Sequence, residues 1–332
     1  MKIHRKPHFV KNKFYNHKKE KKAGFFFKSM LMLILAWSQR KKLQDLRESK
    51  ISDWIVQSDP LSCSIDPVIT WIGHASFLIQ IGGMNILTDP IFGNTSALYP
   101  RIFEPGIALG KMPHIDYVLI SHNHRDHMDR DSLLFLGNKH KKTYFLVPEG
   151  DKAWFDRRGF GYTKEHTWWE QTTFSLKYDE SKEIRFTFLP ALHWSQRGLF
   201  DKNRSLWGSW MIECNGKKIY FAGDTSYWSH FKEISDEFGT VDTALLPIGP
   251  CEPRKWVKHS HLDADEAGKA FLDLKATHFV PMHWGTFPIG LDVFDTPVTL
   301  LQKWWITHKD ELTEKSLHMP KIGQPIKFDF SS

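Results

Sequence analysis

The strongest constraint on this chain is the stretch VLISHNHRDHMDRD, residues 118–131. Four apolar residues, Tyr117 to Ile120, predict a short strand, and metal-ligand side chains follow it directly: His122, His124, Asp126 and His127. The two histidines can face one cation, and the Asp-His pair can face a second as the chain turns toward a helix. A single histidine is more often packed or solvated, but four such side chains in six residues indicate a metal site. Imidazole and carboxylate suit zinc, while manganese, iron and cobalt also accept these ligands.

Four ligands cannot complete two metal sites, so further ligands are expected at the ends of other strands. Three side chains meet this condition: His193 after IRFTFLPAL, Asp224 after KIYFAG and His283 after ATHFVPM. Each stands where a strand pattern stops, with Gly or Pro nearby to turn the chain. We predict that these three complete the metal centre.

In this order of ligands the chain resembles the metallo-β-lactamase-fold hydrolases. The resemblance implies two metal ions, zinc in the first instance, and a shared set of ligands. One metal would take His122, His124 and His193; the other would take Asp126, His127 and His283; Asp224 would bridge them.

The strand pattern predicts an α/β (α+β) fold, a four-layer αββα sandwich. Val68–Ile72 and Phe77–Ile81 are strand-like, and Gly82-Gly83 predicts a hairpin turn into a strand over 84–88. Strands with interspersed helices recur on each side of about residue 200, which predicts two sheets with helices outside. Asp89 follows the third strand, and the resemblance implies that it supports the metal-binding loop from behind; carboxylates commonly orient ligand histidines in this way. For His74, strand packing explains the residue as well as a function does.

The charge of the chain is concentrated at its start. Residues 1–50 hold 15 Lys and Arg against 3 Asp and Glu, a net +12, and the remainder holds 30 against 35, a net −5. We therefore divide the chain into a basic arm, 1–66, and a catalytic domain, 67–332. A body of net −5 without an evident basic and aromatic tract argues against nucleic acid as a partner.

The arm contains an apolar run, Phe25 to Trp37, flanked by basic clusters. With roughly 13 residues, including Lys28 and Ser29, it is shorter than the roughly 20 that a membrane span needs. No small-residue cleavage site precedes the second basic cluster, which argues against a signal peptide. Two interpretations stay open: an interfacial membrane anchor, or a helix that packs on the body.

The three cysteines are far apart and odd in number, which predicts no disulfide framework and fits a reducing compartment. The expected location is the cytoplasm, with contact to the inner face of a membrane through the arm as the open alternative. The sequence makes no prediction of the oligomeric state.

The segment 193–210, HWSQRGLFDKNRSLWGSW, is richer in Trp, Arg and Ser than a connector needs to be. It is either a loop held by its own aromatic residues or a substrate rim in which Arg197 or Arg204 binds an anionic group. With GPCEPR at 249–254 and HWGTF at 283–287, it resembles the N-acyl-phosphatidylethanolamine phospholipase D branch of the family. The resemblance extends from about Trp71 to Phe287.

His261 precedes a predicted helix with Asp263 as its N-cap. In the branch that the chain resembles, a histidine at this place lies near the active site, so His261 is a candidate for substrate binding or proton transfer. The alternative is that His261 lies beside the helix cap and has no functional role. Asp126, Asp224 and His261 are the candidate catalytic residues.

The ligand set predicts a centre that attracts anions. Five neutral histidines and two aspartates carry −2, so two divalent metals and a bridging hydroxide leave about +1. Two such metals can activate a shared water for attack on phosphorus or a carbonyl carbon. The resemblance implies a phospholipid substrate and a phospholipase D-type reaction. A lactonase or another small-molecule hydrolase, a nucleic-acid phosphodiesterase and a metal-free scaffold protein are the alternatives, the last disfavoured because all seven ligands are present.

Overall fold

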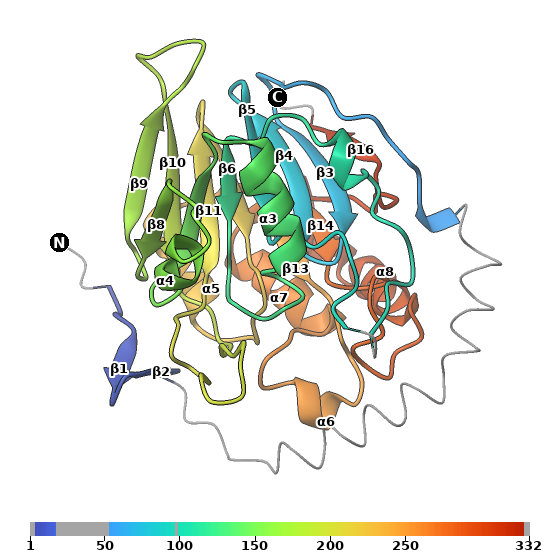
Figure 1. The fold of residues 1–332 in the computed structure, drawn as a ribbon. Helices are drawn as coiled ribbons and strands as arrows, with labels where there is room; N and C mark the ends of the chain where they lie inside the picture. Colours follow the sequence, from blue (N-terminus) through green and yellow to red (C-terminus); the bar gives the residue numbers. More distant parts are fainter. Residues whose placement is uncertain (1–3, 18–52, 97–98, 329–332) are drawn as a thin grey trace.

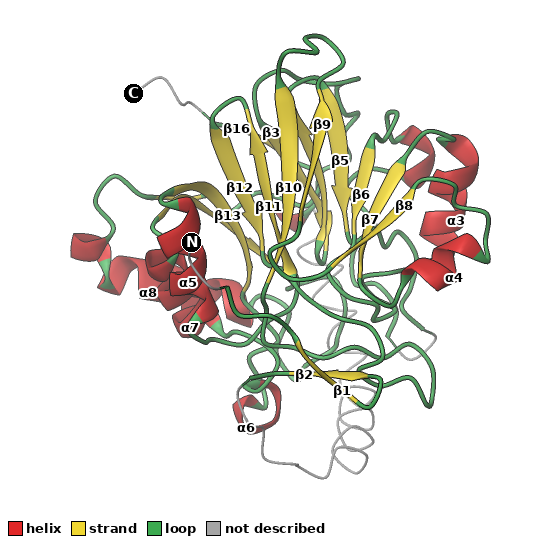
Figure 2. Cartoon of the chain, turned by 90° about the vertical axis from the view of Figure 1, so that its left-hand side faces the viewer, coloured by secondary structure: helices red, strands yellow, loops and turns green. Residues whose placement is uncertain are grey.

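A computed structural model describes residues 4–17, 53–96 and 99–328. Two seven-stranded sheets pack face to face, and helices cover the outer face of each (Figure 1 and Figure 2). The predicted four-layer αββα sandwich is therefore confirmed. Within the described ranges, no helix has the length and apolar character required to cross a membrane.

The first sheet is antiparallel at one edge and parallel at the other, in the order β16-β3-β4-β5-β6-β7-β8. The hairpin predicted at Gly82-Gly83 joins β4 to β5, and both glycines have positive φ, 60° and 72°, as the tight hairpin turn requires. The strands of this sheet are β3 (Val68–Gly73), β4 (Ser76–Ile81), β5 (Met84–Thr88), β6 (Tyr117–Leu119), β7 (Tyr144–Pro148), β8 (Thr163–His166) and β16 (Pro325–Lys327).

The second sheet has the order β15-β14-β13-β12-β11-β10-β9. Its strands are β9 (Gln171–Ser175), β10 (Glu183–Leu189), β11 (Ser209–Cys214), β12 (Lys217–Phe221), β13 (Val241–Pro247), β14 (Ala276–Met282) and β15 (Ser316–Leu317). The two halves thus divide between β8 and β9, and not near residue 200. The division was misplaced because β9 pairs with β10 and β10 pairs with β11, and the second of these is a pairing of distant segments that strand patterns do not encode.

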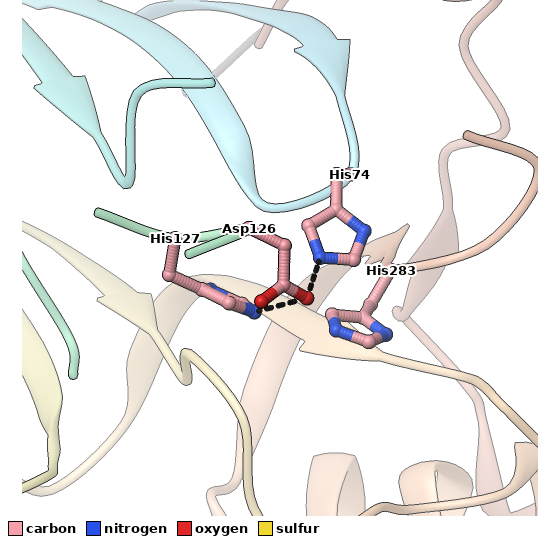
Figure 3. A group of neighbouring side chains, drawn as sticks. All are labelled: His74, Asp126, His127 and His283. Atoms are coloured by element: carbon pink, nitrogen blue, oxygen red, sulfur yellow. Dashed lines mark hydrogen bonds and ion pairs between the residues drawn. The ribbon is translucent and has the colours of Figure 1, made fainter. Parts of the chain in front are cut away.

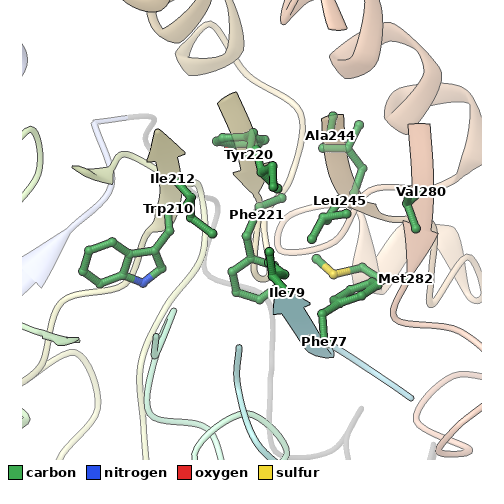
Figure 4. Close-up of a cluster of buried hydrophobic side chains, with 14 of the residues drawn as sticks. Phe77, Ile79, Trp210, Ile212, Tyr220, Phe221, Ala244, Leu245, Val280 and Met282 are labelled. Atoms are coloured by element: carbon green, nitrogen blue, oxygen red, sulfur yellow. The ribbon is translucent and has the colours of Figure 1, made fainter. Parts of the chain in front are cut away.

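The main core lies between the sheets. Phe77 and Ile79 of β4 face Phe221, Leu245 and Met282 of the second sheet, and all five side chains are buried (Figure 4). The residue between the first two, Leu78, belongs instead to a second cluster, which includes residues of α3. Because successive side chains of a strand point to opposite faces, β4 is buried on both faces. Its sheet therefore lies between the second sheet and the outer helices.

The helices lie outside the sheets, with α3 and α4 on the first sheet and α5, α7 and α8 on the second (Figure 2). The helix expected to start near His127 begins at Arg130, because the Asp129 side chain accepts the Ser132 N–H and caps it. Asp263 caps α7 as predicted. The helices are α3 (Arg130–Lys139), α4 (Lys152–Asp156), α5 (His230–Phe238), α6 (Arg254–Val257), α7 (Ala264–Asp273) and α8 (Thr296–Thr307), with short 3-10 turns η1 (Leu109–Lys111) and η2 (Lys309–Glu311).

The first described residues form a hairpin of β1 (His8–Val10) and β2 (Lys13–Tyr15) that contacts the body. Phe14 is buried, its N–H donates to the Asn203 carbonyl, and the Asn203 amide donates back to the Phe14 carbonyl. Residues 4–17 therefore pack on the unit predicted to begin at residue 67. The apolar run Phe25–Trp37, with both of its interpretations, lies outside the described residues.

Candidate metal centre

The predicted ligands meet at one edge of the sandwich because they follow strands that end there. His122 follows β6, His193 follows β10, Asp224 follows β12 and His283 follows β14. The last three strands run in the same direction within the second sheet, so their carboxyl ends share one edge, where the loops of α/β folds commonly build sites.

Glycine allows the Asp224 loop to approach the His122 loop. Gly223 has φ 57°, and a Cβ at this position would stand 2.4 Å from the Cβ of Ser121. Only glycine fits both this left-handed conformation and this close approach. The close approach of the two loops, one from each sheet, therefore requires glycine next to Asp224.

Three imidazole nitrogens converge in the first ligand group. His124 Nδ1 lies 2.8 Å from His122 Nε2 and 3.3 Å from His193 Nε2. The three ligand atoms all lie within 4.8 Å of one another. One proton on His124 Nδ1 can form at most one hydrogen bond shared between the other two nitrogens. One cation, in contrast, can accept a lone pair from all three nitrogens.

A second group combines a carboxylate with three imidazoles, His74, His127 and His283, around Asp126 (Figure 3). Asp126 Oδ2 lies 3.1 Å from His74 Nε2 and 3.6 Å from His127 Nε2. The ring centroids of His74 and His283 are 4.0 Å apart. The predicted second set of ligands is thus brought together, with His74 added.

Asp224 lies between the two groups. Its Oδ2 is 3.4 Å from His127 Nε2, 3.6 Å from His193 Nε2 and 4.0 Å from His122 Nε2, and its Oδ1 is 3.0 Å from His283 Nε2. One carboxylate oxygen therefore faces nitrogens of both groups. This is the position that a bridging ligand requires.

The far nitrogens of the ligand histidines have fixed partners. His193 Nδ1 lies 2.9 Å from the Ser260 carbonyl and His283 Nδ1 lies 3.0 Å from the Gly249 carbonyl. Because a carbonyl only accepts, both Nδ1 atoms carry the proton and both Nε2 atoms present a lone pair to the centre. This tautomer is the one that binds a cation through Nε2.

Asp89 orients two more of the histidines. Its Oδ2 accepts from His127 Nδ1 at 2.7 Å and from the Ser121 hydroxyl at 2.5 Å. Since that hydroxyl donates to Asp89, it accepts from His122 Nδ1, 2.9 Å away. Asp89 is fully buried and lies in the place predicted for it, behind the metal-binding loop.

Burial and neighbouring charge set the protonation of the centre. Burial lowers the pKa of His124 to about 4 and of His193 to about 3, so both rings are neutral near pH 7. Burial opposes charge at His127 as well, but Asp224 and Asp126 raise its pKa well above the usual value. A cation that binds His127 would therefore displace a proton.

The centre is open on one side. His122, His193 and Asp224 are buried, whereas Asp126 keeps 21% of its side chain exposed and His261 keeps 15%. His261 Nδ1 lies 3.6 Å from Asp224 Oδ2, so the residue predicted near the site does lie at its open side.

The two predicted substrate-binding arginines differ in environment. The Arg197 guanidinium lies over the Trp154 ring, and its Nη1 donates to the carbonyls of Met128 (2.6 Å) and Asn123 (3.3 Å). Arg197 therefore stabilises the loop that carries His124. Arg204 is exposed. A role in substrate binding stays a prediction for both arginines.

His74 is the contact residue that the sequence left open between packing and function. It lies in the turn between β3 and β4 with φ 54°, and its N–H donates to the Thr286 hydroxyl at 2.6 Å. The one available signal was a histidine beside glycine at the end of a strand, the same context as the ligands. A single histidine in that context does not distinguish packing from function.

Buried polar atoms without hydrogen-bond partners indicate that the residues of the centre fit a metal ion. Among the described residues, several buried polar atoms of the centre have no hydrogen-bond partner. They are His124 Nε2, His127 Nε2, His261 Nδ1, His283 Nε2 and Asp224 Oδ1. Buried polar atoms are normally satisfied, and imidazole with carboxylate is a donor set for divalent cations.

The comparison with known families agrees with this geometry. A family model described as a beta-lactamase superfamily domain matches residues 84–284. The chain belongs to this superfamily. The match includes all the predicted ligands, and the chain combines the mixed two-sheet fold with a His/Asp cluster that could hold a metal ion.

Two curated relatives within the superfamily share the same name. The chain is 34% identical over 232 residues to N-acyl-phosphatidylethanolamine-hydrolyzing phospholipase D 1 of Caenorhabditis elegans, covering 67% of this chain and 64% of that protein. It is 34% identical over 270 residues to the mitochondrial enzyme of that name from Saccharomyces cerevisiae, covering 78% and 56%. The chain thus spans less than two-thirds of each relative.

A solved structure supports the fold of this superfamily member. Igni18, a metallo hydrolase from the archaeon Ignicoccus hospitalis, superposes with a TM-score of 0.61 at 24% identity, covering 80% of this chain and 99% of Igni18. At this identity the likeness concerns the fold alone.

Proposed function

We propose that the chain is a phosphodiesterase of the phospholipase D type that uses two zinc ions to hydrolyse N-acyl-phosphatidylethanolamine-like phospholipids. The products would be phosphatidic acid and an N-acylethanolamine. The observation that carries the proposal is the position of Asp224 between two groups of ligand atoms. Similarity to two relatives named for this reaction supports the choice of substrate.

The ligand sets follow from the two groups. One ion would be held by His122, His124 and His193, and the other by Asp126, His127 and His283, with Asp224 shared between them. Two divalent ions bound there supply Lewis acidity, which activates water at neutral pH and neutralises charge that builds on the phosphoryl oxygens. No side chain is required as a nucleophile.

His261 is suited to contact the substrate. Its carbonyl accepts from Arg254 Nη1 at 2.9 Å, which fixes the backbone beside the open side of the centre. Burial lowers the pKa of its imidazole to about 3, so the ring is neutral at pH 7 and offers one donor and one acceptor nitrogen. We assign it to orienting the phosphoryl group or the scissile oxygen.

Aromatic packing beside the open side would also limit the access of water to the centre. The Trp194 ring lies against His124 edge-on, with centroids 4.1 Å apart, and screens that face of the first group. A phosphodiester would approach past Trp194 and His261 toward Asp126. The net positive charge expected of the loaded centre favours an anionic group on this path.

The proposed partners follow from the substrate. The phospholipid lies in a bilayer, so we propose peripheral contact with the inner face of a membrane, from the cytoplasm, and no nucleic-acid partner. The described body carries the acidic part of the chain's charge, which supports the second point. A lactonase or another small-molecule hydrolase would use the same ligands, but it would not need membrane contact.

The test of this proposal is turnover of N-acyl-phosphatidylethanolamine by the full chain with its metal content quantified. Asp224→Asn keeps the shape of the side chain and removes the charge that two cations would share. We expect turnover to fall by about three orders of magnitude with unchanged circular dichroism, since both activation and charge neutralisation need this site. Full activity of Asp224→Asn would refute the bridging role.

A further inference from the structure

Two large apolar side chains stand exposed in the loop that follows His193. Leu199 and Phe200 are each 85% exposed, more than any other large apolar side chain of the described residues. Scattered exposed apolar residues are ordinary on protein surfaces. Two adjacent ones at this level, in a loop that carries a metal-ligand residue, call for an explanation.

The loop holds these side chains outward by its own hydrogen bonds. The Asp201 carboxylate accepts from the N–H of Arg197 at 3.1 Å and from the N–H of Gly198 at 2.8 Å. The Asp201 carbonyl accepts from the N–H of Arg204 at 3.0 Å. Leu199 and Phe200 therefore occupy the tip of a closed turn, here called the apolar tip.

The base of this turn is fixed to the metal centre. Arg197 Nη1 donates to the Met128 carbonyl next to His127, and the ring of Trp194 lies against His124. Lys202, at the far side of the turn, places its Nζ 4.8 Å from the centroid of Trp194. The apolar tip is thus a hydrogen-bonded extension of the loop that borders the open side.

The N-terminal hairpin continues the same surface. It is joined to the loop by two hydrogen bonds between Phe14 and Asn203, and it exposes Phe9 (52%) and Val10 (42%). Figure 2 shows β1 and β2 at the end of the molecule where the loops leave the sheets. The same segments carry exposed cations: Lys11 at the hairpin turn, Arg125 in the metal-binding loop and Arg204 after the tip.

We propose that the apolar tip and the β1–β2 hairpin form a docking surface for the interfacial layer of an anionic phospholipid bilayer. Exposed apolar side chains in segments that also carry exposed cations match such a layer, since the apolar groups enter the acyl boundary and the cations meet phosphate. Docking in this orientation would bring the open side of the centre to the bilayer. The proposal rests on the proposed function, because it assumes a substrate that lies in a membrane.

The test compares two variants of the full chain that lose exposed apolar side chains at different places on the surface. Leu199→Ser with Phe200→Ser removes the tip, and Ile306→Ser on α8, where Ile306 is 72% exposed, is the control for loss of an exposed apolar side chain elsewhere. In sedimentation with vesicles of equal phosphatidylcholine and phosphatidylglycerol, we expect the tip variant to bind at least ~10-fold more weakly and the control to bind like wild type. Turnover of substrate dispersed in detergent should be unchanged in both.

A direct positional measurement reports which part of the surface meets the vesicle. An environment-sensitive fluorophore is attached to Phe200→Cys or Ile306→Cys in a background in which the exposed Cys63 is replaced by Ser. Addition of the same vesicles should shift the emission to shorter wavelength at position 200 and leave position 306 unchanged.

Three outcomes would contradict the docking surface or the proposed function. Equal vesicle binding by both Ser variants with no emission shift at position 200 overturns the docking surface. Loss of self-association in the tip variant, with vesicle binding intact, makes the tip an interface between copies of the chain instead. Tip-dependent vesicle binding by a wild-type chain that cleaves no N-acylated phospholipid keeps the docking surface and removes the proposed function.

Discussion

The Nε2 atom of His74 lies 3.1 Å from Oδ2 of Asp126, in a buried turn more than fifty residues earlier in the chain. The same residue accepts the His283 N–H at its carbonyl, 3.1 Å away. His74 therefore contacts two predicted ligands of the second ion. Its φ of 54°, unusual for a residue with a Cβ, fits a backbone held in place by these contacts.

We expect His74→Ala to weaken binding of one ion by about 10- to 100-fold and to leave the other unchanged, since supporting partners of ligands typically contribute this much. Titration against a competing chelator, followed by metal quantification, measures both affinities. His114→Ala, at the opposite end of β6 and exposed, is the control. Two ions retained at wild-type affinity would mean that His74 only packs.

Asp89→Asn tests the support behind the metal-binding loop. The carboxylate accepts from His127 Nδ1, from the Ser121 hydroxyl and from the Ser121 N–H. An amide has one accepting oxygen, so its NH₂ group would face a donor, and at least one of these hydrogen bonds is lost. We expect about 10- to 100-fold weaker metal affinity. Unchanged affinity in equilibrium dialysis would remove Asp89 from the account.

Arg197 and Arg204 offer a matched pair of substitutions. Arg197→Gln loses the hydrogen bonds to Met128 and Asn123 and the contact with Trp154, so we expect a loss of about 1–3 kcal/mol in the free energy of unfolding. Arg204→Gln, at an exposed position, should stay within about 0.5 kcal/mol. Urea unfolding measures both. A substrate role for either arginine would appear separately, as a raised KM, which for Arg204→Gln would come at an unchanged unfolding midpoint.

Asp151 predicts a pH dependence of stability. Burial raises the pKa of this carboxyl to about 7, although Asn123 and Ser205 donate to its Oδ1. Between the unfolded pKa near 4 and about 7, the folded state binds more protons than the unfolded state, so stability falls as pH rises through this window. Asp151→Asn cannot ionise. We expect its melting temperature relative to wild type to be higher at pH 8 than at pH 5; an equal difference at both pH values would contradict the raised pKa.

The side chains that gather at the candidate metal centre were predictable because their pattern is local or stands at strand ends. His122, His124, Asp126 and His127 lie within six residues, and the remaining three each terminate an apolar run. Burial of a strand and the need to turn at its end are visible in a sequence. The four-layer architecture follows from the same alternation.

The features that sequence analysis misplaced or missed all depend on contacts between distant segments. The two halves divide at residue 166 and not near 200, because β9 and β10 join the second sheet through β11. The contact of Phe14 with Asn203, which fixes the N-terminal hairpin to the body, spans 189 positions. His74 meets Asp126 only after β3 and β4 have folded against the metal-binding loop.

The measurement that tests the central claim most directly is turnover of N-acyl-phosphatidylethanolamine by the metal-loaded chain, compared with a simple phosphodiester and a lactone. The account predicts cleavage to phosphatidic acid and N-acylethanolamine, lost on chelation and restored by zinc. Hydrolysis of the lactone or of a simple ester, with the lipid left intact, would retain the metal centre and contradict the phospholipid substrate.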